Sequence, residues 1–162
     1  MLKRCHPNLF KTANCDCGNG WYVVLDMLSD ALDASGACVV YNRICEKFGS
    51  LNVYWDPDDS ARSEAMLDIT NTVRPIISKY EDLALRICER CGLFNEDSIY
   101  PVSAGWMKRI CENCQHLRSA WPSGNNFGFS NFEFSAHELM RQRMILSNAV
   151  KEQKLKVFTA TS

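Results

Sequence analysis

The chain has 162 residues, 46% of them hydrophobic and 23% charged, and a formal net charge of −1 at pH 7. This composition is enough for one domain with a true core, and it excludes general disorder and the strongly basic charge of a dedicated DNA-binding domain. No apolar run approaches the roughly 18 residues of a membrane span, and the first residues lack the apolar run of a signal peptide, so we expect a soluble cytoplasmic protein without membrane contact.

The N-terminal part of the chain predicts an irregular arm followed by a helix. Residues 1–18 are polar and show no clear period, and they are expected to form the arm. A helix should then begin at Gly20 and end at Gly36, because glycine commonly ends helices. Its apolar residues recur at helical spacing on one face; they are Trp21, Leu25, Leu28 and Leu32.

A β-hairpin and a long helix are expected next. Residues 37–41 and 51–55 are rich in β-branched and aromatic side chains, and they flank a Gly-containing turn. An apolar residue every three to four positions then predicts a helix over about 61–86, with a kink at Pro75, which lacks a backbone donor. The end of this helix leads directly into Cys88.

The most specific motif is a repeated C-x-x-C sequence. Cys88 and Cys91 are followed, after nineteen residues, by Cys111 and Cys114, which is a ligand spacing typical of a structural zinc site. Two such pairs complete a tetrahedral shell of thiolates with no open position for a substrate. One pair alone could be a redox dithiol, but two pairs at this separation favour a metal. We therefore expect one structural Zn²⁺ held by these four cysteines.

The rest of the chain predicts a small zinc module and a C-terminal helix. A knuckle, a short hairpin and a helix with the second cysteine pair would follow one another as in a treble-clef module. A capping box at Ser135–Glu138 predicts a last helix that ends near residue 153. The expected fold is α+β, as one compact unit in three parts: a helix–hairpin–helix scaffold (1–87), the four-cysteine zinc module (88–120), and a Phe-rich segment with the C-terminal helix (121–162).

The other five cysteines leave two interpretations open. Four residues of the arm could hold a second zinc ion; they are Cys5, His6, Cys15 and Cys17. The C-x-C spacing is less usual for zinc, however, and free or core thiols are the favoured interpretation. Cys38 and Cys45 fall in the first predicted strand, where a free cysteine packs as a small hydrophobe.

Residues near the zinc module are candidates for contact with a partner. The basic residues could compensate the negative charge of a thiolate-bound zinc, or they could contact phosphate or an acidic protein surface. The aromatic cluster of residues 127–134 could fold back onto the core or form an exposed patch. The candidate partner-binding residues are Arg86, Arg90, Trp106, Lys108, Arg109, Phe127 and Phe129.

Catalysis is not expected. Treble-clef modules occur in HNH-type nucleases, whose chemistry needs a histidine that activates water and further groups that hold a catalytic metal. The chain has three histidines, His6, His116 and His137, and none forms a His-His or Asp-His pair between Cys91 and Cys111. A nuclease is therefore the least favoured alternative.

Four short motifs lie over residues 15–116: the sequence C-G-N-G-W at 17–21, the sequence C-E-K-F-G-S-L at 45–51, the sequence C-E-R-C-G at 88–92, and Gly105-Trp106 before Cys111. Together they resemble a family of small uncharacterised zinc-binding proteins of bacteria and their phages. Ser50 departs from the glycine often seen at that turn. The resemblance implies zinc and an origin in a mobile element, and it implies no reaction.

These observations together predict a non-catalytic, zinc-stabilised binding protein. By the resemblance, it would be an accessory protein of a phage or mobile element that engages, or inhibits, a host protein or defence complex. The alternative is a nucleic-acid-binding protein that uses the basic face of the zinc module. The sequence leaves the oligomeric state open.

Overall fold

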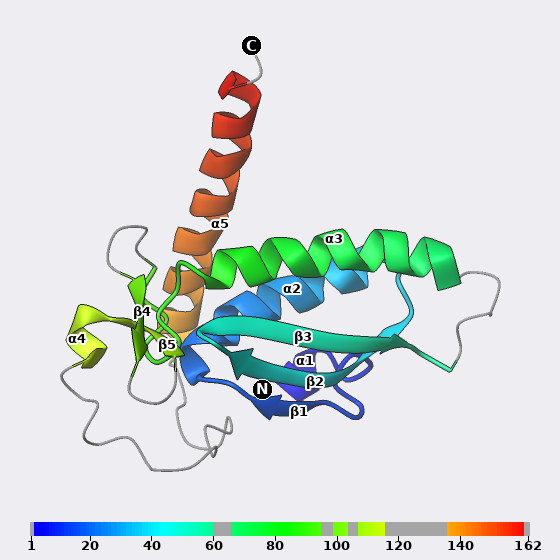
Figure 1. Ribbon diagram of the computed structural model, residues 1–162. Helices are drawn as coiled ribbons and strands as arrows, with labels where there is room; N and C mark the ends of the chain where they lie inside the picture. The colour runs from blue at the N-terminus through cyan, green and yellow to red at the C-terminus, as the bar shows by residue number, and fades with distance from the viewer. Residues whose placement is uncertain (1, 60–65, 95–98, 104–106, 116–135, 161–162) are drawn as a thin grey trace.

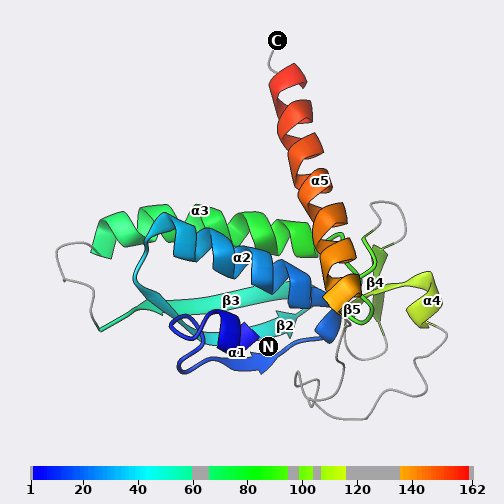
Figure 2. The same cartoon turned by 180° about the vertical axis from the view of Figure 1, so that it is seen from behind.

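The computed structural model describes residues 2–59, 66–94, 99–103, 107–115 and 136–160 (Figure 1). Helices α2 and α3 lie side by side over one face of a sheet, and the β4–β5 hairpin and α4 stand at one end of this layered body (Figures 1 and 2). Helix α5 begins at that end, crosses α2 and runs away from the body. None of the described helices combines the length and the apolar character that a membrane span needs.

The described residues thus form a mixed α+β fold, as the sequence predicts. A three-stranded sheet has the order β1-β2-β3, and β4 and β5 form a separate antiparallel pair. The elements in chain order are α1 (Leu2–Cys5), β1 (Asn14–Asp16), the 3₁₀ turn η1 (Asn19–Trp21), α2 (Tyr22–Ser35), β2 (Val39–Lys47), β3 (Ser50–Pro57), α3 (Met66–Ala84), β4 (Ile99–Ser103), β5 (Met107–Cys111), α4 (Glu112–Gln115) and α5 (Ala136–Ala160).

The prediction of an irregular N-terminal arm is wrong. This segment contains helix α1 and strand β1, which pairs with β2 in parallel and so extends the sheet. Leu9 and Phe10 are buried, the carbonyl of Leu9 accepts a hydrogen bond from the N–H of Tyr41, and the Phe10 ring meets the Tyr41 ring edge-on. A three-residue strand is too short to show a period of two in the sequence, which is why the pattern failed there.

Helix α2 has the predicted buried face. Its four apolar stripe residues, which begin with Trp21 just before the helix, are each fully buried in the core between the sheet and α3. The indole N–H of Trp21 donates to the carbonyl of Ile87 at 3.1 Å, which joins the start of α2 to the end of α3. Gly36 ends the helix in the left-handed conformation, as expected.

The predicted hairpin is confirmed as β2 and β3. Lys47 pairs with Ser50, so the connection has two residues, Phe48 and Gly49, which both have positive φ angles, of 52° and 75°. These angles are those of a tight hairpin turn whose twist matches that of the strands. Cys45 is buried in β2, but Cys38 precedes the strand and is exposed, so its predicted packing role is wrong.

Helices α3 and α5 complete the core. Helix α3 continues through Pro75 and buries Val73, Ile77, Tyr80 and Leu83, while residues 61–65 of the predicted helix lie outside the described part. Helix α5 extends beyond the predicted end at residue 153, and Leu146 inserts from it into the same core as α2 and α3. The capping residue Ser135 lies outside the described residues.

Candidate metal centre

The four cysteines of the two C-x-x-C motifs come together in space. Cys88 and Cys91 follow α3, Cys111 ends β5, and Cys114 lies in α4. Their Sγ atoms all lie within 4.8 Å of one another, and three of the side chains are buried while Cys91 is half-buried. Among the described residues, these cysteines are the one group of His, Cys, Asp or Glu side chains whose ligand atoms lie close enough together to hold a metal ion.

The loop that holds the first pair is fixed by backbone hydrogen bonds. The N–H of Gly92 donates to the carbonyl of Cys88, and the N–H of Cys88 donates to the carbonyl of Leu93, each at 2.9 Å. Gly92 has a φ of 73°, which lets the chain turn sharply after the second cysteine. The N–H of Glu89 donates to the carbonyl of Arg109 at 2.8 Å, so this loop of residues 88–93, which we call the knuckle, is also attached to β5.

The cluster already favours a thiolate at one of its members. Hydrogen bonds from the Cys91 thiol and from the backbone at Cys111, Cys91 and Arg90 lower the pKa of the Cys88 thiol to about 5. Donation to Cys88 raises the pKa of Cys91, and burial raises the pKa of Cys114 to about 12. The thiols of Cys91 and Cys114 therefore stay protonated beside the anionic Cys88 sulfur, and a metal ion that binds the cluster would displace these protons.

Two glycines let the start of α2 approach the knuckle closely. The N–H of Gly20 donates to the carbonyl of Glu89 at 2.8 Å. A Cβ atom on Gly20 would lie 2.1 Å from the Cys88 carbonyl oxygen, and one on Gly18 would lie 2.3 Å from the Glu89 carbonyl oxygen. The G-N-G-W sequence is therefore the docking site of the cysteine knuckle on the core.

A buried ion-pair network joins the β2–β3 turn to the same knuckle. Lys108 on β5 pairs with Glu46 at 2.6 Å and with Glu89 at 3.0 Å, and all three side chains are largely buried. Burial is the main reason that the pKa of Glu89 rises to about 7, and the Lys108 cation opposes this shift. Because buried charges need partners, Lys108 holds two carboxylates in place between the hairpin and the knuckle.

Helix α5 closes the other side of the knuckle. Gln142 is buried, and its Nε2 atom donates to the Cys91 carbonyl at 3.4 Å and to Glu138 Oε1 at 3.2 Å. A pocket of about 360 Å³ lies between the knuckle and α5, lined by Cys91, Cys114, Leu93 and Ile145 among others. The cysteine cluster thus contacts the hairpin on one side and α5 on the other.

The residues proposed for a second metal site do not form a ligand group in the described structure. Cys5 is exposed in α1, Cys15 is half-buried in β1, and Cys17 is buried in the core. Burial raises the pKa of Cys15 to about 11 and that of Cys17 well above its ordinary value, so both favour the neutral thiol. They behave as the packing thiols of the alternative interpretation.

His6 has a different environment from the one that the sequence suggested. It is buried against α2, where Nδ1 lies 2.7 Å from Asp33 and Nε2 lies 3.4 Å from Asp26. Arg143 of α5 pairs with Asp26 and Asp30 on the same acidic edge of α2. His6 and Arg143 therefore attach the N-terminal segment and α5 to one helix, and neither contact was predicted.

The predicted partner-binding residues fall into three groups. Trp106, Phe127 and Phe129 lie outside the described residues. Arg86 and Arg90 are half-buried beside the knuckle and each has an interaction partner. Lys108 is in the ion-pair network, and Arg109 Nε donates to the Gly49 carbonyl at 3.1 Å. The last two residues therefore brace the hairpin; a role in partner binding stays a prediction for the set.

Sequence reasoning found the four cysteines but missed the residues that position them. Gln142 and the two glycines of the docking motif reach the first cysteine pair from distant parts of the sequence, and Glu46 reaches it through Lys108, which also pairs with Glu89 between the two cysteines. The G-x-G spacing before a buried Trp was the one available signal of a close approach. Comparisons with protein-family models, with curated proteins and with solved structures found no match.

Proposed function

We propose that the chain is a non-catalytic, zinc-stabilised binding protein. The observation that carries this proposal is the position of the four thiols: they lie where the start of α2, the β2–β3 turn and α5 meet, and three are buried. A tetrahedral shell of four thiolates leaves no position for a reacting water. Such an ion would fix three parts of the fold relative to one another.

The geometry of the thiols fits zinc. The Sγ atoms of Cys91 and Cys111 lie 3.7 Å apart. Zinc–thiolate bonds of about 2.3 Å in a tetrahedron place neighbouring sulfurs about 3.8 Å apart. The order of knuckle, antiparallel hairpin and short helix with the last cysteine supports a treble-clef-like module. When bound, the ion would supply structural cross-linking; the residues that would hold it are Cys88, Cys91, Cys111 and Cys114.

A protein is the favoured partner class. The basic residues Lys108 and Arg109 already bind groups of the chain itself, and the net charge of −1 provides little attraction for phosphates. Large hydrophobic side chains are exposed instead, including Phe48, Met140 and Met144. Nucleic acid binding by the basic face is the second candidate, supported by half-buried Arg86 and Arg90 beside the knuckle.

The biological setting in this proposal rests on other grounds. All nine cysteines lie among the described residues and none is in a disulfide, which suits the reducing cytoplasm. That the partner belongs to a host cell, and that the chain serves a phage or mobile element against it, rests on the motif resemblance alone.

Metal content and partner capture test the proposal together. Native mass spectrometry of the full chain should show one Zn²⁺, which Cys111→Ser removes and Cys38→Ser, at an exposed cysteine, retains. Immobilised wild-type protein should capture a protein from bacterial lysate at both low and moderate salt, whereas the Cys111→Ser variant should not. A chain without zinc, or capture of generic DNA or RNA that is lost steeply with salt, would contradict the leading form of the proposal.

A further inference from the structure

The end of the β2–β3 hairpin carries an unusual residue. Phe48 occupies the first of the two turn positions with a φ of 52°, and 79% of its surface is exposed. Side chains with a Cβ atom are disfavoured in this region, and turns of this kind prefer Asn or Asp followed by Gly. A phenylalanine here strains the backbone and buries almost nothing in return.

The part of the chain that the structure describes therefore gives no stabilising reason for a phenylalanine at position 48. Asparagine would tolerate the positive φ angle and would remove an exposed aromatic ring. Strained residues that persist without a packing role are found where a protein binds or reacts. Since the two turn residues, Phe48 and Gly49, carry no reactive side chain, the strained backbone supports a role in binding.

The tip of the hairpin (Lys47, Phe48 and Gly49) is held rigidly by β5 and, through Lys108, by the knuckle. The Gly49 N–H donates to Glu46 Oε1 at 2.7 Å, and the Gly49 carbonyl accepts from Arg109 at 3.1 Å. Lys108 pairs with the same Glu46 at 2.6 Å and links it to the knuckle. A side chain mounted on such a braced turn loses little conformational freedom when it binds a partner.

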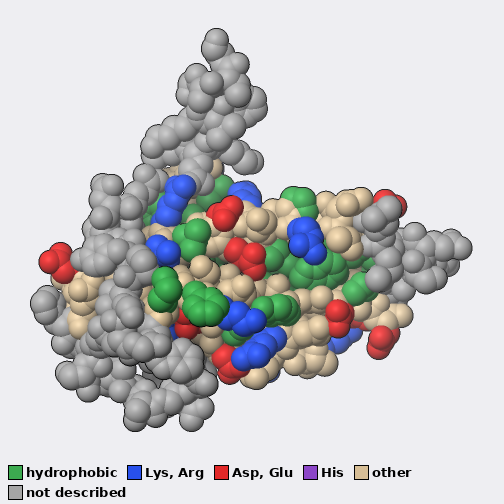
Figure 3. All heavy atoms as spheres, viewed as in Figure 1, with side chains coloured by type: hydrophobic (Ala, Val, Ile, Leu, Met, Phe, Trp, Pro, Cys, Tyr) green, Lys and Arg blue, Asp and Glu red, His purple; other side chains and the backbone are tan. Residues whose placement is uncertain are grey.

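The surroundings of Phe48 define the chemistry of a partner. Lys47 ends β2 and the partly exposed Tyr54 lies on β3, and Lys47 Nζ donates to the Tyr54 hydroxyl at 2.6 Å. Figure 3 shows hydrophobic side chains beside Lys and Arg side chains over this end of the hairpin. The nearby carboxylates of Glu46 and Glu89 are buried, with side-chain exposures of 7% and 4%. The side chains exposed at the turn itself, Phe48 and Lys47, are thus apolar and cationic.

We propose that the tip, defined as Lys47, Phe48 and Gly49, is the surface that engages a protein partner. The ring of Phe48 enters an apolar pocket of the partner, and Asp or Glu side chains at the rim of that pocket face Lys47. Buried aromatic anchors of this kind dominate the energy of protein interfaces, and complementary rim charges accelerate association. This inference rests on the proposed binding function and names the part of the molecule that performs it.

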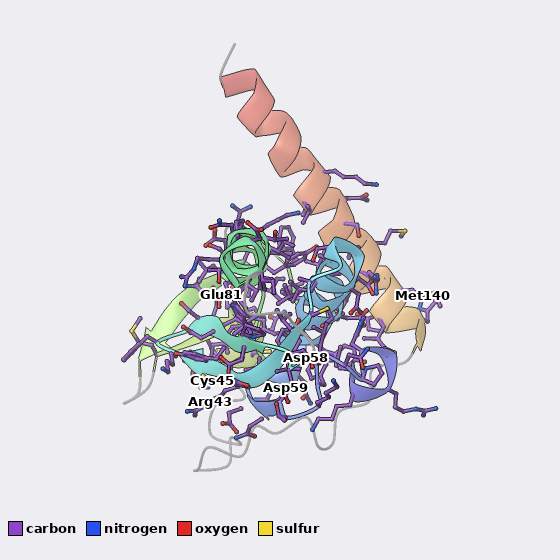
Figure 4. The ribbon with its side chains drawn as sticks, turned by 90° about the vertical axis from the view of Figure 1, so that its right-hand side faces the viewer. Arg43, Cys45, Asp58, Asp59, Glu81 and Met140 are labelled. Carbon is purple, nitrogen blue, oxygen red and sulfur yellow. The ribbon has the colours of Figure 1, made fainter. Side chains whose placement is uncertain are left out.

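Site-specific photocrosslinking tests this placement. The full chain, loaded with zinc, carries p-benzoylphenylalanine at position 48 in one variant and at position 140 in a control, and each is irradiated in bacterial cells. Met140 is a suitable control because it is 70% exposed and lies on α5. Figure 4 shows Met140 well away from Arg43 and Cys45, which lie on β2, the strand that leads into the hairpin turn.

The expected result is a protein crosslinked from position 48 and not from position 140, with the crosslinked peptide in an apolar pocket bordered by Asp or Glu. Phe48→Asn should then weaken binding of that protein about tenfold or more, and Lys47→Glu should slow its association. Crosslinking from position 140 alone would overturn the placement and leave the binding function standing. Crosslinks to nucleic acid or to a second copy would overturn the partner class, and no crosslink from either position would count against both proposals.

Discussion

The N–H of Gly20 donates a hydrogen bond of 2.8 Å to the carbonyl of Glu89, and this bond connects the start of α2 to the cysteine knuckle. Glu89 lies between the first two cysteines, and its side chain pairs with Lys108, which in turn pairs with Glu46 beside the hairpin turn. Three motifs therefore meet at one junction: the glycine motif at the start of α2, the β2–β3 turn and the cysteine knuckle.

Replacement of Gly20 should separate the knuckle from the core. In Gly20→Ala, the new Cβ atom would lie 2.1 Å from the Cys88 carbonyl oxygen and 2.6 Å from the Gly92 nitrogen, so the backbone must shift. We expect a loss of about 2–3 kcal/mol in the free energy of unfolding, measured by urea denaturation in the presence of zinc. Gly36→Asn is the control, because a Cβ at Gly36 meets nothing within 4 Å and asparagine tolerates its conformation. Equal stability of the two variants would contradict the close docking.

Removal of the Lys108 cation should be costly because it leaves buried carboxylates without a partner. We expect Lys108→Met to destabilise the fold by about 3–5 kcal/mol, as is typical when one member of a buried ion pair is lost. Lys11→Met provides a matched control, since Lys11 pairs with Asp58 but has a side chain that is 50% exposed, and its loss should cost less than about 1 kcal/mol.

Thermal unfolding of both lysine variants, followed by circular dichroism, measures this difference. Zinc content should be determined alongside, because under the proposed function the variant with the less stable knuckle should also release its zinc to a chelator sooner than wild type. Similar melting temperatures for Lys108→Met and Lys11→Met would show that the network contributes no more than a surface pair.

The features of this structure that could be predicted from the sequence are those that depend on local patterns. The C-x-x-C pairs, the stripe of Trp21, Leu25 and Leu28, and the strand–Gly–strand pattern each depend on residues close together in the chain. Strand β1 and the pairing of Lys108 with Glu46, which is 62 residues away, depend on tertiary contacts. Such contacts leave no periodic signal, so the cysteine cluster was predictable and the residues that position it were not.

Glu81 should give a stability difference that depends on pH. Its Oε1 accepts a hydrogen bond from the Val53 N–H at 2.8 Å, and burial raises its pKa above the ordinary value of 4.5. A raised carboxyl pKa means that the folded state holds the proton more tightly than the unfolded state, so the stability from protonation is lost as pH rises through the folded pKa. Glu81→Gln, which keeps the acceptor without charge, should therefore be more stable than wild type at pH 7.

We expect this gain to be at most about 1 kcal/mol, because Glu81 is only half-buried. Urea denaturation of the two proteins from pH 4 to pH 7 should show a gap that opens as pH rises above 4.5 and then levels off above the folded pKa. The exposed neighbour Asp82, changed to Asn, controls for the loss of one negative charge from α3. A gap that narrows with rising pH would show that the charged form of Glu81 is the stabilising one.

Arg143 should determine how firmly α5 is attached to the core. It pairs with Asp26 and Asp30, which are one turn apart on α2 and repel each other without a cation. Arg143→Met should therefore cost about 1 kcal/mol and speed hydrogen exchange in α5 around Gln142 and Leu146, the residues that contact the knuckle and the core. Arg141→Met is the matched control, because Arg141 has a side chain that is 60% exposed and pairs with Glu138 within the same helix. If exchange in α5 accelerates equally in both variants, or in neither, the acidic edge of α2 does not hold this helix, and Gln142 and Leu146 suffice to dock it against the cysteine knuckle and the core.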